Sequence, residues 1–103
     1  MIRGTTPTLL FRLPFSASQI KAAEITIKYV DNLKKEIMVK TLEDCTVEEK
    51  SISIMLTQEE TLRFPAQTSV AVQLRVLTND DVALATEPQY VKVKKLLSGD
   101  VIE

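Results

Sequence analysis

The residues that could perform catalysis or bind a metal are few in this chain. It holds no histidine and a single cysteine, Cys45, and its only glycines are Gly4 and Gly99. No Ser-His or Cys-His dyad, no usual zinc site and no glycine-rich phosphate loop can be built from this set. The sequence therefore predicts that the chain is not an enzyme. It predicts no catalytic, cofactor-binding or metal-binding residues and no cofactor.

Acidic side chains are the remaining candidates for chemistry. Calcium takes oxygen ligands, which Asn79, Asp80 and Asp81, or Glu43 and Asp44, could supply. Neither group has the spacing of a known calcium loop, and Asn and Asp are also common turn residues. We interpret both groups as solvated turns.

Carboxylates are concentrated between residues 43 and 60, where six acids accompany one lysine. The pairs Glu48-Glu49 and Glu59-Glu60 are adjacent in sequence, so their side chains point in different directions and do not form catalytic pairs. The stretch is either an acidic docking face for a basic partner or a solvated rim. We favour the rim.

Cys45 and a lysine cluster complete the reactive side chains. Asp44 precedes Cys45, and a nearby acid raises the pKa of a thiol, so we interpret Cys45 as a small packed residue. Lys92, Lys94 and Lys95 lie on the last predicted strand, where lysine protects a sheet edge from aggregation. The net charge of −1 and the few aromatic residues argue against nucleic acid as a partner.

Alternating apolar residues run through most of the chain. The clearest examples start at Ile25, Ile52 and Val70, where every second residue is apolar. Period two is typical of strands with one buried face. We predict strands at residues 8–13, 24–30, 36–42, 51–56, 69–78, 82–86 and 89–95. Seven short strands predict one all-β domain over residues 1–103, an immunoglobulin-like antiparallel β-sandwich, with a small barrel as the alternative.

Two capping-box patterns follow predicted strands. Ser16 precedes Gln19 by three residues, and Thr57 precedes Glu60 by three. We expect a single helical turn at each, where the chain crosses between the two sheets. The alternative at the second is one continuous helix to Phe64. Turns are expected at residues 31–32 and 79–81, and an acidic loop at residues 43–50.

The C-terminal residues are unusually apolar for a chain end. Leu96, Leu97, Val101 and Ile102 either fold back onto the domain or fill a groove on a neighbour. The first residues lack the apolar segment of a signal peptide, and no apolar run is long enough to span a bilayer. We therefore expect a cytoplasmic protein that does not contact a membrane.

Three stretches together resemble a family. They are Arg-Gly-Thr-Thr-Pro-Thr at residues 3–8, Leu-Thr-Gln-Glu-Glu-Thr-Leu at 56–62 and Leu-Thr-Asn-Asp at 77–80. Over nearly the whole chain the sequence resembles a family of small phage and prophage proteins of Firmicutes. More loosely, it is similar to the N-terminal immunoglobulin-like domain of phage baseplate upper proteins. One departure is Asp81, which stands where such hairpins commonly carry glycine.

This resemblance implies a virion structural protein of the tail or baseplate. Its expected partners are other virion proteins or further copies of itself, bound through edge strands and the C-terminal tail. Its expected location is the host cytoplasm during assembly and then the virion. The family contributes no site residues. The alternative is a module that binds carbohydrate or a host surface. Sugars stack on exposed aromatic rings, and Phe11 and Tyr29 are expected on apolar faces, which leaves few rings for that role.

Overall fold

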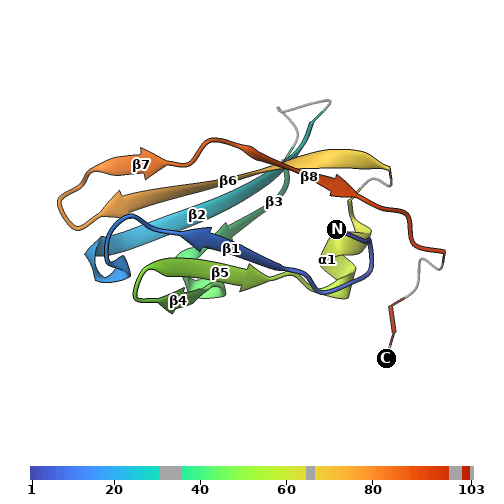
Figure 1. The fold of residues 1–103 in the computed structure, drawn as a ribbon, viewed down its shortest axis with the longest axis horizontal. Helices are drawn as coiled ribbons and strands as arrows, with labels where there is room; N and C mark the ends of the chain where they lie inside the picture. Colours follow the sequence, from blue (N-terminus) through green and yellow to red (C-terminus); the bar gives the residue numbers. More distant parts are fainter. Residues whose placement is uncertain (31–35, 65–66, 98–100, 103) are drawn as a thin grey trace.

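The computed structural model describes residues 1–30, 36–64, 67–97 and 101–102 (Figure 1). Its strands are β1 (Thr8–Arg12), β2 (Ile20–Tyr29), β3 (Glu36–Thr41), β4 (Thr46–Glu48), β5 (Ser51–Met55), β6 (Thr68–Thr78), β7 (Ala83–Ala85) and β8 (Gln89–Val93). Its helical turns are the 3-10 turns η1 (Ala17–Gln19) and η2 (Leu42–Asp44) and the short α-helix α1 (Gln58–Leu62).

The strands form two antiparallel sheets that face each other. The smaller sheet has the order β1-β5-β4, and the larger has β3-β2-β6 with both β7 and β8 on the far edge of β6. This is an immunoglobulin-like order: β1, β5 and β4 take the places of strands B, E and D, and β2, β3 and β6 those of C, C′ and F. β7 and β8 together take the place of strand G. The predicted all-β sandwich is confirmed.

The core lies between the sheets and follows the predicted alternation. Along β5 and the central parts of β2 and β6, every second residue points inward and is buried, which contributes about 1.5–3 kcal/mol for each large apolar side chain. The buried apolar residues that follow this alternation are Ile25, Ile27, Ile52, Ile54, Val70, Val72, Leu74 and Val76, and Ile20, Ala23 and Ala71 of the same strands are buried as well. Phe64, just after α1, closes one end of the core.

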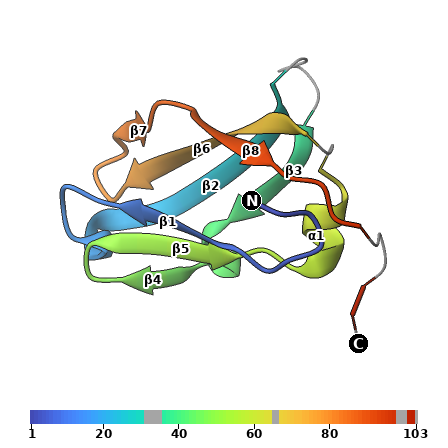
Figure 2. The ribbon, with the colours of Figure 1, turned by 45° about the vertical axis from the view of Figure 1, so that its right-hand side comes forward.

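Each passage between the sheets carries a helical turn (Figure 2). η1 leads from β1 to β2 and α1 from β5 to β6, so both predicted crossings are confirmed. The helix at the second crossing ends at Leu62, which removes the alternative of a continuous helix to Phe64. A third turn, η2, leads from β3 to β4. Residues 43–50, predicted as a loop, therefore include the end of η2 and strand β4.

Several boundaries differ from the prediction. β2 begins at Ile20 rather than residue 24, because two alanines with weak strand preference conceal its start. β8 ends at Val93 rather than residue 95. At η1 the hydroxyl of Ser16 accepts from the Ser18 amide, at 3.4 Å, instead of forming the predicted box with Gln19. The turn expected at residues 31–32 lies outside the described residues.

Candidate functional site

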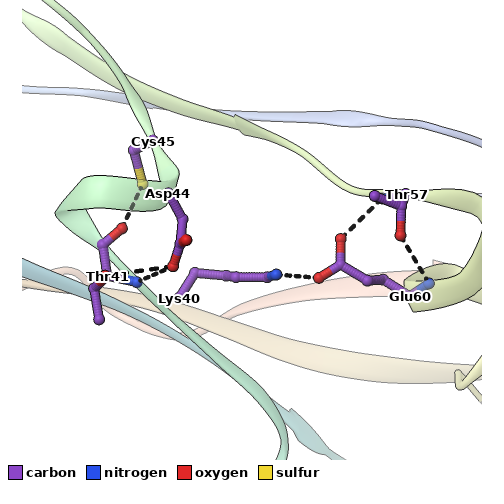
Figure 3. Close-up of polar contacts among 6 residues, drawn as sticks. All are labelled: Lys40, Thr41, Asp44, Cys45, Thr57 and Glu60. Atoms are coloured by element: carbon purple, nitrogen blue, oxygen red, sulfur yellow. Dashed lines mark hydrogen bonds and ion pairs between the residues drawn. The ribbon is translucent and has the colours of Figure 1, made fainter.

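A charged network lies at one open side of the sandwich, between β3 and α1 (Figure 3). Lys40 pairs in register with the buried Ile25, so it points inward from the edge strand β3. There its ammonium group forms an ion pair with Oε2 of Glu60. The other oxygen, Oε1, accepts from the amide of Thr57 at 2.9 Å, and Thr57 Oγ1 accepts from the Glu60 amide at 3.1 Å. The predicted capping box at α1 is confirmed.

The surroundings of Glu60 favour its ionised form. Burial raises the pKa of this carboxyl, but the hydrogen bonds from Lys40 and from the Thr57 amide lower it further than burial raises it. The pKa therefore lies below its ordinary value. The carboxylate of Glu60 therefore links α1 to β3, and both of its oxygens already have partners.

Asp44, the last residue of η2, and Cys45, which follows it, are structural residues. The Cys45 thiol donates to the carbonyl oxygen of Thr41 at 3.3 Å. Burial raises the pKa of this thiol, and the charge of Asp44 adds to the rise. The predicted direction is confirmed, with burial as the larger cause. The pKa of Asp44 is lowered, chiefly because its carboxylate accepts from the Thr41 amide at 3.0 Å.

The acidic stretch from residue 43 to 60 therefore divides into two sets. Asp44 and Glu60 have partners within the molecule, although Asp44 is exposed. The other four acids are exposed and extend toward solvent: Glu43, Glu48, Glu49 and Glu59. Among the residues described, no three His, Cys, Asp or Glu side chains come together as metal ligands.

The residues at 79–81 form the turn between β6 and β7. Asp81 has a φ of 63°, the left-handed conformation that glycine would adopt more easily, and its carboxylate forms an ion pair with Lys21. Asn79 donates from its amide to the Gln19 carbonyl at 2.7 Å and from Nδ2 to the Ser18 carbonyl at 3.0 Å. These contacts support the turn interpretation and attach the hairpin to η1.

The Arg-Gly-Thr segment at residues 3–5 packs against α1 and forms hydrogen bonds with it. Arg3 donates from Nη2 to the Leu62 carbonyl at 2.7 Å, at the C-terminal end of the helix, where a cation is favourable. Thr5 accepts through its carbonyl from Oγ1 of the buried Thr61, at 2.9 Å. The Arg-Gly-Thr segment thus has a structural role in the fold.

The two chain ends differ in how they are held. Ile2 pairs in parallel with Lys94, so the N-terminal residues cover the edge of the sheet just beyond β8. Leu96 folds back beside Gly4, as one alternative predicted. Leu97 and Ile102 remain 99% and 80% exposed, although the Ile102 amide and carbonyl both bond to the side chain of Gln58.

A polar groove of about 330 Å³ lies on the outer face of the larger sheet. Small Ala71 pairs with Lys28 on one side and with Tyr90 on the other, so two long side chains flank a short one. Tyr90 is 63% exposed along this groove. Val91 and Val93 point inward, and Tyr90 alternates with them along β8. This alternation is the sequence signal that places Tyr90 on the outer face. The other lining residues are Glu24, Thr26, Gln73, Arg75 and Pro88.

The fold and these surfaces define the chain as an immunoglobulin-like β-sandwich whose distinctive features are sheet edges, an outer groove and an exposed apolar end. Comparison of the chain with protein-family models, with curated proteins and with solved structures gave no match. None of the helices in the described ranges has the length and apolar character needed to cross a membrane.

Proposed function

We propose that this protein is a phage or prophage structural protein, an immunoglobulin-like module associated with the tail or baseplate that acts by docking to other proteins. Its partners are other virion proteins or further copies of itself. It is made in the host cytoplasm and becomes part of the virion.

The observation that carries the proposal is the apolar surface at the C-terminal end. Leu97 and Ile102 project almost entirely into solvent beyond a fold whose core is already closed. Exposed apolar groups gathered in one region mark an interaction site. The family resemblance supplies the virion context, and the sheet edges offer further contacts.

The proposal is tested on purified particles of the phage that encodes the protein. We expect quantitative mass spectrometry to find the protein in banded virions, and in the tail fraction after heads and tails are separated. Detection only in the soluble lysate would contradict a structural role. Detection in heads alone would replace the tail or baseplate by the capsid.

A second candidate function is carbohydrate binding at the polar groove. The observation that favours it is the exposed ring of Tyr90 beside groups that hydrogen-bond to hydroxyls, among them Gln73 and Arg75. A glycan array would show binding that Tyr90→Ala abolishes and that Leu10→Ala, on the opposite sheet, retains. An array without signals, together with the protein in virions, would leave docking as the function.

A further inference from the structure

The two sheets differ in width on the side where β1 and β7 lie. The smaller sheet is three strands across, whereas the larger has four positions because β7 and β8 share the place beyond β6. In the immunoglobulin order, strand A would pair with the strand that β1 replaces. Of the described strands, only β5 pairs with β1, so the place beside β1 and beneath β7 holds no strand.

The backbone of β1 carries unpaired groups along this free edge. The Leu56 amide donates to the Pro7 carbonyl at 2.9 Å, and the Leu13 amide donates to the Lys50 carbonyl at 2.8 Å. Because backbone groups alternate in direction along a strand, Thr8, Leu10 and Arg12 turn theirs away from β5. Within the described part of the chain, no backbone group is bonded to these outward groups.

Next to this edge lies an apolar hollow of about 250 Å³. Leu84 of β7 pairs in register with the buried Val76, so it faces the inside of the sandwich, yet it is 44% exposed. Leu13 and Phe15, in the segment between β1 and η1, line the hollow from below, and Arg12 is the one charged residue in its lining. An unpaired edge beside an apolar hollow has the features of a site for β-strand addition.

One segment of the chain has a length and a composition that suit this site. Residues 97–103 read Leu-Ser-Gly-Asp-Val-Ile-Glu, with three apolar residues, two acids and no base. Seven residues suffice for the five-residue edge of β1, and their negative charge complements Arg12. Because Ile102 is held at α1, at the opposite end of a molecule 46 Å long from β7, this segment would have to come from another copy (Figures 1 and 2).

We propose that the free edge of β1 and the adjoining hollow bind residues 97–103 of a second copy as an added strand. The proposal rests on the proposed docking function and names its partner. Each copy would then offer one donor tail and one acceptor edge. Such a head-to-tail contact builds rings or filaments rather than closed pairs, as repeated virion assemblies require.

The test uses two variants that each lose one half of the contact. Leu84→Asp places a carboxylate in the hollow, where it repels the acidic tail, and deletion of residues 97–103 removes the donor. We expect the unmodified protein to associate with rising concentration in sedimentation velocity and both variants to stay monomeric. An equimolar mixture of the two should form a 1:1 heterodimer, because one variant keeps its tail and the other its acceptor edge.

The matched control is Val47→Asp, which changes an apolar residue of similar exposure, 46%, on β4 at the opposite edge of the smaller sheet and should preserve association. A peptide of residues 95–103 should bind the tail-deleted protein and bind Leu84→Asp at least tenfold more weakly. Circular dichroism verifies folding, and the peptide titration gives an independent readout should Leu84→Asp unfold.

Four results would each overturn the proposal: a monomeric unmodified protein, association of either variant alone, a monomeric mixture, or absent peptide binding. Detection in virions is a separate result, so failure of strand addition would leave the structural role standing.

Discussion

At the scale of single residues, Glu60 contributes to two elements at once. One carboxylate oxygen caps the first turn of α1, and the other pairs with Lys40 from β3. Lys40 points inward at a sheet edge, a position that discourages a second sheet from adding there. The same ion pair therefore stabilises the fold and protects the edge of β3.

Acid should weaken the fold through Glu60. Because its folded-state pKa lies below the ordinary value of about 4.5, ionised Glu60 stabilises the protein above that pH. This contribution is lost as the pH falls through 4.5 and then through the lower folded-state pKa. We expect the urea midpoint to fall between pH 6 and pH 3. Glu60→Gln should lower it at pH 6 and flatten the pH dependence, whereas Glu59→Gln, an exposed change on the same turn, should keep the slope. An unchanged slope in Glu60→Gln would contradict this role.

The left-handed backbone at Asp81 gives a second prediction. Glycine adopts a φ of 63° without steric cost and alanine does not, so Asp81→Gly should be more stable than Asp81→Ala by about 1 kcal/mol. Both substitutions lose the exposed ion pair with Lys21, so the comparison isolates the backbone term. Thermal unfolding measures the difference, and equal melting temperatures would show that the turn relaxes to another conformation.

At the scale of elements, α1 depends on groups distant in sequence. Gly4 has a φ of 73°, and a Cβ added there would lie 2.6 Å from Cδ2 of Leu96. Gly4→Ala should therefore cost about 1–3 kcal/mol, from backbone strain and from displacement of Leu96. In a Leu96→Ala background the strain and a 3.3 Å contact with Cδ2 of Leu62 remain, so the cost should be smaller. Urea unfolding of the four proteins measures the coupling. Strictly additive costs would show that the two residues do not compete for space.

The elements also show what local sequence patterns can reveal. The strands containing Ile25, Ile52 and Val70 were predictable because alternation over five or more residues shows directly in the sequence. The cap at Thr57 was predictable because its donors and acceptors lie within one turn. β4 was not, since its three residues are all exposed and carry no alternation. The start of β2 was concealed by alanines, whose strand conformation depends on pairing with β6.

At the scale of the whole molecule, the features that matter for docking come from strand order. The pairing of Ile2 with Lys94 brings the two terminal segments of the chain together. The edge of β1 is free because the smaller sheet has one strand position fewer than the larger sheet. No local pattern encodes either fact. The apolar tail was visible in the sequence, but the sequence left open whether it folds back. The structure places Leu96 against the domain and leaves Leu97 exposed.

The two chain ends should consequently respond differently to deletion. Removing residues 2–4 eliminates the Arg3 bond to the Leu62 carbonyl and the backbone pairing with Lys94. Several hydrogen bonds at about 0.5–1.5 kcal/mol each predict a loss of roughly 2–4 kcal/mol, with faster amide exchange in α1. Removing residues 97–103 deletes the exposed side chains of Leu97, Val101 and Ile102 and should change monomer stability by less than about 1 kcal/mol. Urea unfolding at low protein concentration separates this effect from association. Equal losses for both deletions would contradict the unequal anchoring of the ends, because the C-terminal residues would then stabilise the domain itself and not a contact with another copy.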